Sequence, residues 1–231
     1  MSDERKVFRN FINLSIANVG ARALGFLSLV YLSRVLLPEG LGAISLAMAI
    51  VSYAALLLNQ GFNTYGAREV AKDESGAPKL VNAIVTMRLL LSIVAFLLTV
   101  LAAYLFIQNL QVRTLTILYG ITLFCTALTL DWVFWGLEQL RVVSIAQLLG
   151  ATVYLVCILL FVNEQQKIYL VPLFYVLYLA IPFSITNIVY RRKIARFNFS
   201  FDLQLWKVAL RDSIPMGMSI RPPRNAKFLF I

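Results

Sequence analysis

Six stretches of about 20 predominantly apolar residues follow one another along this chain, and they constrain its fold more than any other feature. The stretches are 11–32, 41–60, 80–107, 115–135, 142–162 and 168–190. About 20 residues is the length that an α-helix needs to cross the hydrocarbon core of a bilayer. Only 14% of the residues are charged, whereas about a quarter are charged in a typical soluble domain. The sequence therefore predicts an all-α, polytopic membrane protein with a bundle of six transmembrane helices.

A seventh apolar stretch, 208–220, is too short to cross a bilayer comfortably. It contains Pro215 and Gly217, and it runs into a segment with two prolines between two arginines, 221–224. We therefore expect a truncated seventh helix. The predicted organisation is a six-helix bundle over residues 1–206 with an inner basic loop at 191–206, the truncated helix at 207–220 and an irregular tail at 221–231.

The net charge of +10 would suggest a nucleic-acid partner in a soluble protein, but here the basic residues gather in alternate loops. With a cytoplasmic N-terminus, the inner segments hold Arg5, Lys6, Arg9, Arg68, Lys72, Lys79, Arg141, Arg191, Arg192, Lys193, Arg196, Lys207 and Arg211, and the outer loops hold only Arg34, Arg113 and Lys167. This bias follows the positive-inside rule. It predicts a cytoplasmic N-terminus and no nucleic-acid partner, and the cluster at 191–196 is expected to bind anionic lipids of the inner leaflet.

Histidine is absent from the chain, which excludes His-based acid–base catalysis and His metal ligands. The eleven acidic residues lie almost entirely in loops, and no pair has the spacing of a catalytic dyad. We expect a protein that is not an enzyme and that has no catalytic residue, metal site or cofactor.

Arg22 lies near the middle of the first apolar stretch. A charge at that depth costs about 2.5–3.5 kcal/mol on insertion scales, so such a residue usually faces a protein interior or a watery cavity. Helical spacing places Ser15, Asn18, Arg22 and Gly25 on one face of this helix. The opposite face carries Ile12, Ile16, Val19, Ala23, Phe26 and Val30. The pattern predicts one face toward a cavity or partner and the other toward lipid.

Two further charges lie within or at the end of predicted spans. Arg88 either extends to the inner head groups or lines a cavity. Asp131 is a solvated acid at a helix end, the partner of an arginine, or a site for a proton or cation at the mouth of a cavity. Beside it, Trp132 and Trp135 predict an inner aromatic belt.

The second span carries Ser45, Ser52 and Asn59 at intervals of seven residues. Small and weakly polar residues at this spacing are typical of close helix contacts in lipid. The alternative is that the line of polar side chains helps to hydrate a cavity.

Several short motifs occur in an order that resembles a known family. They are the run from Tyr31 to Gly42, then Gly61-Phe62-Asn63, Ala67-Arg68-Glu69 and, much later, Arg211 to Gly217. Together they resemble the polysaccharide biosynthesis flippases of the multidrug/oligosaccharidyl-lipid/polysaccharide exporter superfamily. The resemblance covers nearly all of the chain to about Met218.

The resemblance implies two helical bundles that face each other across a cavity in the bacterial cytoplasmic (inner) membrane. It implies a substrate in which an oligosaccharide is carried on a polyprenyl diphosphate. Arginine offers forked donors that fit phosphate oxygens, so Arg22 is the first candidate for contact with this head group and Arg88 the second. Ser15, Asn18 and Asn59 would line the same cavity. Asp131 is the candidate for coupling to a proton or sodium gradient.

The chain departs from the family pattern because it stops after one bundle. We therefore expect the N-terminal half of a flippase, which would need a second half-transporter chain or a second copy of itself. The alternatives are a fragment of a related multidrug or lipid exporter, or an inactive truncated fragment. A polyprenyl-phosphate transferase is less favoured, because its loop acids would have to hold a divalent metal and Asp73 and Glu74 alone are poor candidates.

Overall fold

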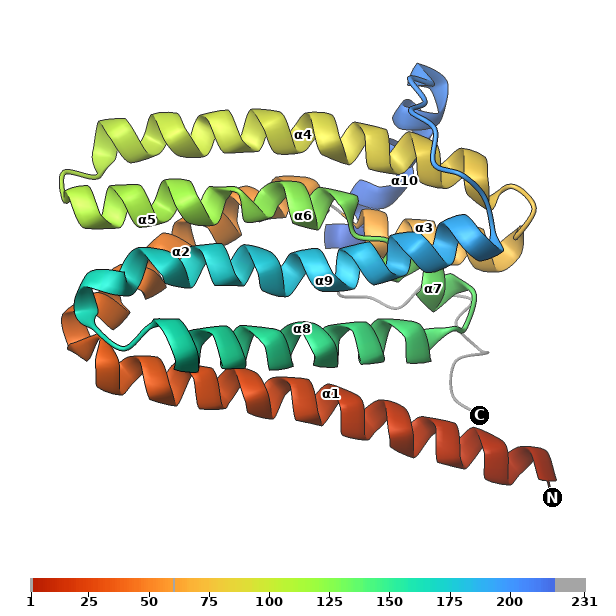
Figure 1. Cartoon of the computed structure of the whole chain (residues 1–231). Coiled ribbons are helices and arrows are strands. Elements are labelled where there is room, and N and C mark those ends of the chain that lie inside the picture. The colour runs from red at the N-terminus through yellow and green to blue at the C-terminus, as the bar shows by residue number, and fades with distance from the viewer. Residues whose placement is uncertain (1, 60, 219–231) are drawn as a thin grey trace.

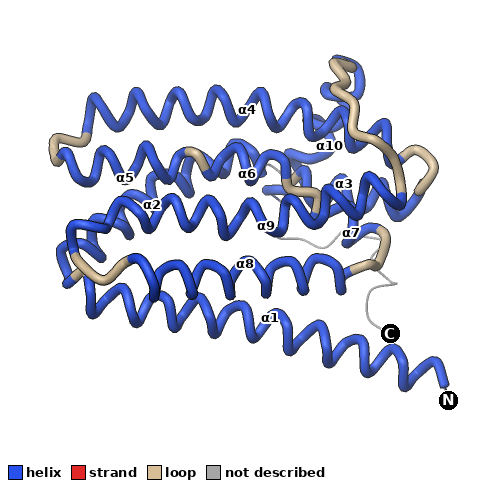
Figure 2. Tube along the Cα trace, viewed as in Figure 1, coloured by secondary structure: helices blue, strands red, loops and turns tan. Residues whose placement is uncertain are grey.

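The computed structural model describes residues 2–59 and 61–218, with the side chains of residues 17–59, 61–211 and 213. Every regular element in these ranges is a helix, as Figure 2 shows, so the prediction of an all-α fold is confirmed. Five helical segments of the described part are long and apolar enough to cross a membrane. The expected total of six spans and a truncated seventh is not confirmed and stays a prediction.

The helices form one elongated bundle (Figure 1). In chain order they are α1 (Ser2–Val35), α2 (Leu37–Asn59), α3 (Phe62–Lys72), α4 (Ala77–Phe106), α5 (Leu110–Gly120), α6 (Thr122–Leu128), α7 (Asp131–Gly136), α8 (Leu140–Phe161), the 3-10 turn η1 (Gln165–Tyr169), α9 (Leu170–Lys193) and α10 (Leu203–Met218). Helix α1 packs on α8, α8 on α9, and α9 on α5 and α6, while α2 contacts α1, α4 and α5. The short helices α3, α7 and α10 gather at one end of the bundle.

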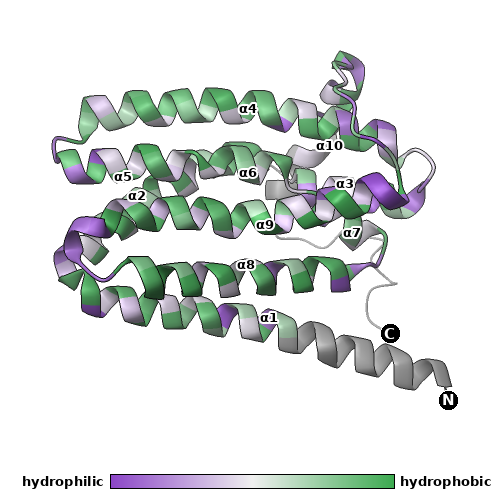
Figure 3. Ribbon diagram, in the orientation of Figure 1, coloured by the Kyte–Doolittle hydropathy of each residue, from purple (hydrophilic) through white to green (hydrophobic). Residues whose placement is uncertain are grey.

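The outer surface of the long helices is apolar. Hydrophilic residues collect mainly at the two ends of the bundle, and hydrophobic ones along the helices (Figure 3). Large side chains such as Leu97, Leu101 and Tyr104 of α4 and Leu160 of α8 are more than half exposed. So broad an apolar surface is unfavourable in water, whereas lipid tails are as apolar as leucine. The protein is therefore a multi-pass membrane protein.

The fourth predicted span, 115–135, lies within a stretch, Leu110–Gly136, that is long and apolar enough to cross a membrane, but its helix is interrupted. It is divided into α5, α6 and α7. Threonine hydroxyls bond back to carbonyls of the preceding turn, from Thr122 to Tyr119 (2.6 Å), from Thr126 to Thr122 (2.9 Å) and from Thr129 to Cys125 (2.9 Å). Such bonds compete with the helical ladder and bend helices, which fits breaks beside Thr122 and Thr129.

Trp132 is only 1% exposed, so the expected aromatic belt is wrong for this residue. Its ring lies on α3 at Gly66, where a Cβ atom would come within 2.4 Å of the ring. Trp135 is exposed, as expected of a belt residue. The contact holds α7 against α3 at one end of the bundle.

Helices α8 and α9 approach closely at Gly150. A Cβ atom there would lie 2.7 Å from the carbonyl oxygen of Tyr178 and 3.2 Å from the Pro182 ring. Pro182 lies four residues after Tyr178 and has no N–H to donate, so it leaves this carbonyl without its usual helical partner. Glycine at position 150 therefore lets α8 approach α9 at the same carbonyl that Pro182 leaves without a donor.

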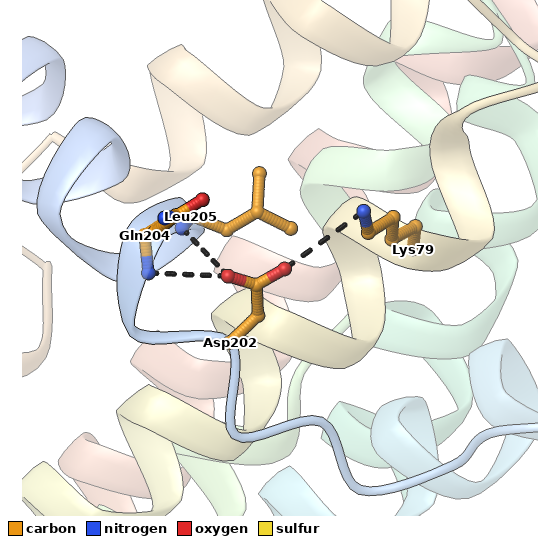
Figure 4. A network of polar contacts seen from close by, with 4 residues as sticks. All are labelled: Lys79, Asp202, Gln204 and Leu205. Carbon is orange, nitrogen blue, oxygen red and sulfur yellow. Dashed lines mark hydrogen bonds and ion pairs between the residues drawn. The ribbon is translucent and has the colours of Figure 1, made fainter.

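The segment between α9 and α10 is fastened along the beginning of α4. The backbone N–H of Asn198 donates to Asn82 Oδ1 (3.1 Å), and that of Ser200 donates to Thr86 Oγ1 (3.2 Å). Asp202 accepts bonds from the first N–H groups of α10, at Gln204 and Leu205, and lies 3.8 Å from Lys79 Nζ (Figure 4). A carboxylate in this position caps the helix.

This cap starts α10 at Leu203, five residues before the predicted apolar stretch at 208–220. Helix α9 likewise continues to Lys193, into the predicted inner basic loop. The predicted tail, 221–231, lies outside the described residues, and the proposed domain boundaries stay a prediction.

Candidate substrate-binding cavities

A cavity of about 540 Å³ lies among α1, α7, α8 and α9, with both polar and apolar residues on its wall. We call it the Arg22 cavity; its lining residues are Asn18, Ala21, Arg22, Gly25, Trp135, Leu140, Val143, Ser144, Gln147 and Tyr178. Arg22 is the one charged residue among them. Beside it, Ser144 of α8 donates a hydrogen bond to Asn18 Oδ1 (3.3 Å), which joins the two helices at the wall. The structure thus brings Asn18, Arg22 and Gly25 to one cavity, as their helical spacing predicts.

The guanidinium of Arg22 has no competing partner among the residues that the structure describes. Its side chain is exposed, and it forms no hydrogen bond or ion pair with any described group. On the other side of α1, Val19 and Phe26 are 65% and 64% exposed, in agreement with the predicted lipid-facing side. Arg22 therefore offers a full set of donors to whatever enters the cavity.

A second cavity of about 230 Å³ lies among α1, α2, α5, α8 and α9. We call it the tyrosine cavity, because Tyr119, Tyr154, Tyr175 and Tyr178 line it. Ala21, Gly25 and Tyr178 border both cavities, so the two adjoin. The sequence reasoning did not single out these tyrosines as a group. Their position inside apolar spans could have pointed to them, because tyrosine in membrane proteins is more usual at the membrane interface.

The two cavities lie at different depths along the bundle. Helix α1 ends and α9 begins at the same end of the bundle (Figure 1). At 1.5 Å per residue, Tyr175 and Tyr178 lie roughly 8 and 12 Å from that end, and Arg22 lies roughly 20 Å from it. The Arg22 cavity is therefore near mid-depth, and the tyrosine cavity continues from it toward the turns that join α1 to α2 and α8 to α9.

Arg88 lies elsewhere, inside the bundle and only 1% exposed. Its Nη1 donates to Asn63 Oδ1 (3.2 Å), and its Nη2 donates to Asn59 Oδ1 (3.3 Å) and to the carbonyl oxygen of Thr126 (2.9 Å). We call Arg88, Asn59, Asn63 and Thr126 the Arg88 cluster. Neither Arg88 nor Asn59 is among the residues that line the two cavities. Each has a partner inside the protein, and a place for them on the same cavity wall as Arg22 stays a prediction.

The Arg88 cluster joins two helix breaks. Asn59 ends α2 and Asn63 lies in the first turn of α3, on either side of Gly61, whose φ of 81° is in the left-handed region. Thr126 lies in the last turn of α6, and its carbonyl oxygen accepts a longer bond from the Thr129 N–H (3.4 Å) besides the bond from Arg88. A positive charge is favourable at such a helix C-terminus. Arg88 thus fixes the α2–α3 break against the α6–α7 break.

Asp131 is the first residue of α7, and its side chain is half-buried. Its Oδ2 accepts a bond from Gln147 Nε2 (3.2 Å), and Gln147 lines that cavity. Asp131 also interacts electrostatically with Arg88, although the two form no direct ion pair among the described contacts. The readings that the sequence left open for Asp131, ion coupling among them, stay predictions.

The side chain of Ser15 lies outside the described residues. Within the described part of the chain, no group of three or more His, Cys, Asp or Glu side chains is placed to hold a metal ion.

Comparison with known proteins adds two findings. The sequence profile of the polysaccharide biosynthesis protein family matches residues 7–220. The fold is similar to that of a MOP superfamily transporter from Pyrococcus furiosus, with a TM-score of 0.65 and 19% identity over 89% of this chain and 50% of that one. At this identity the likeness shows the fold alone, and this chain spans about half of that transporter's length. No curated protein matches the chain.

Proposed function

The chain belongs to the polysaccharide biosynthesis protein family, and from this premise we propose that it forms one bundle of a flippase for polyprenyl-diphosphate-linked oligosaccharide. The membrane would be the bacterial cytoplasmic membrane, with the N-terminus in the cytoplasm. The family and the fold point to transport rather than to catalysis.

The observation that carries this proposal is the guanidinium of Arg22, which among the described residues has no partner and is the one charge that lines its cavity. Its positive sign favours an anionic cargo over a cationic drug. A diphosphate leaving bulk water needs a counter-charge and hydrogen-bond donors, and the arginine fork supplies both. Asn18 and Ser144 on the wall, together with Gln147, would add polar contacts to the head group.

The test is equilibrium binding of a polyprenyl diphosphate to the purified chain in nanodiscs, with the corresponding polyprenol as the uncharged probe. Arg22→Gln should weaken diphosphate binding at least about tenfold, in line with about 1.5–3 kcal/mol for a hydrogen bond to a charged group, and leave polyprenol binding unchanged. Arg34→Gln is the matched control, because Arg34 is an exposed arginine at the end of the same helix and lines neither cavity. Equal effects of the two substitutions would rule out head-group contact by Arg22.

We propose anionic inner-leaflet lipid as a second partner, bound by the basic and aromatic segment 191–201. Arg191, Arg192 and Lys193 end α9 with exposed side chains, and Phe199 and Phe201 beyond them are exposed. Basic residues attract anionic head groups while aromatic rings favour the interface.

Phosphatidylglycerol nanodiscs should therefore raise the thermal midpoint of the chain above its value in phosphatidylcholine. Neutralising Arg191, Arg192 and Lys193 to glutamine should remove that gain. Neutralising Arg34 and Arg113, which lie at the other end of the bundle, should not. A gain that survives the triple substitution would contradict the lipid site.

A further inference from the structure

Four tyrosine rings from three helices meet on the wall of the tyrosine cavity. Tyr175 is central, with ring-centroid distances of 5.7 Å to Tyr119, 5.9 Å to Tyr154 and 5.3 Å to Tyr178. The rings are tilted or edge-on to one another, the arrangement that aromatic pairs prefer. Rings that support one another in this way form a stiff wall.

Tyr119 at this wall has a hydroxyl without a partner. The residue is 1% exposed, and its oxygen has no hydrogen bond to any group that the structure describes. Buried tyrosine hydroxyls usually find a partner, because an unsatisfied polar group costs free energy. A polar ligand that reaches the wall of this cavity would supply the missing bond.

The combination of aromatic faces and phenolic hydroxyls selects a ligand with both an apolar face and a polar rim. A pyranose ring has this character, with C–H groups on its faces and hydroxyls around its edge. The volume of about 230 Å³ is less than half that of the Arg22 cavity, which favours one such ring rather than several. An isoprenoid chain would leave the hydroxyl unpaired, and it has the surrounding bilayer as its own solvent.

We propose that the tyrosine cavity binds one sugar ring of the lipid-linked oligosaccharide, the ring adjoining the diphosphate that Arg22 contacts. Ala21, Gly25 and Tyr178 border both cavities, so one ligand can occupy the two together. This inference rests on the proposed function and adds a second subsite to it. The sugar lies on the side of the diphosphate that faces the α1–α2 and α8–α9 turns.

The test uses the purified chain in nanodiscs and two probes, a polyprenyl diphosphate that carries one N-acetylglucosamine and the same diphosphate without sugar. Tyr119→Phe removes only the unpaired hydroxyl. It should weaken binding of the sugar-bearing probe about three- to tenfold and leave the sugar-free probe unchanged. Tyr190→Phe is the matched control, because the Tyr190 hydroxyl is also buried without a described partner but lies in a separate core cluster.

A second variant, Tyr175→Leu, removes the central ring and should weaken the sugar-bearing probe further. Equal weakening of both probes by Tyr119→Phe, or no weakening of either, would overturn the sugar subsite. Failure of the proposed function gives a different result, in which Arg22→Gln does not weaken the sugar-free probe. If Tyr119→Phe then still weakened binding of the sugar-bearing probe alone, the sugar subsite would be supported without the head-group contact of Arg22.

Discussion

Arg88→Met should lower the free energy of unfolding of the bundle by about 1–3 kcal/mol, the range for leaving a buried hydrogen-bonding group without its partner. Methionine keeps much of the apolar stem but has no donors. The side-chain carbonyls of Asn59 and Asn63 would lose their bonds, and so would the end of α6 at Thr126. Asp131 would also lose the nearby positive charge. Thermal or detergent denaturation of the chain in nanodiscs measures the effect.

Arg141→Met is the control for this prediction, because Arg141 is exposed in the first turn of α8. Arg88→Lys should fall between wild type and Arg88→Met, since lysine keeps the charge but cannot reproduce the planar fork. If Arg88→Met were no more harmful than Arg141→Met, the Arg88 cluster would not be holding the two helix breaks together.

Gly25→Leu should abolish measurable binding of the sugar-bearing diphosphate, a loss of at least about 100-fold, while the thermal midpoint stays close to that of wild type. Gly25 borders both cavities, and a Cβ atom there would meet nothing within 4 Å. The Cβ atom of a leucine therefore meets no clash, and we expect the rest of its side chain to enter the junction. Overpacking normally costs stability, but here the added atoms enter empty space. Equilibrium binding and thermal denaturation of the same preparations separate the two effects.

Gly42→Leu is the matched control, because Gly42 is also open, with nothing within 4 Å of an added Cβ, and lines neither cavity. It should bind both probes as wild type does. Normal binding by Gly25→Leu would show that the ligand does not pass from one cavity to the other.

The features that the sequence predicted well depend on local periodicity. The length of the apolar stretches determines where most of the long helices lie, and α2, α4, α8 and α9 each cover the greater part of a predicted span. The three- and four-residue spacing around Arg22 likewise placed Asn18, Arg22 and Gly25 on one side of α1. Both patterns are properties of a single helix, so they can be identified from the sequence without knowledge of the rest of the fold.

The features that it missed depend on contacts between distant segments. Asn59, Asn63 and Thr126 lie between 25 and 38 residues from Arg88, and only the topology brings them together. Trp132 was assigned to the interface by its residue type, but Gly66 makes room for its ring inside the protein. The fourth span appeared continuous because hydropathy does not register threonine bonds to the backbone.

Helix α9 should bend more easily at Tyr178 than elsewhere, because the carbonyl of Tyr178 has no helical N–H donor. A helix normally resists bending because its hydrogen bonds stretch, but at this turn Pro182 has already removed one. Bending α9 here would therefore cost less than bending it elsewhere, and Tyr178 at this turn is one of the three residues that border both cavities. The junction of the two cavities thus lies beside a turn of α9 that lacks one hydrogen bond, so we expect a small change in the axis of α9 to alter the width of this junction.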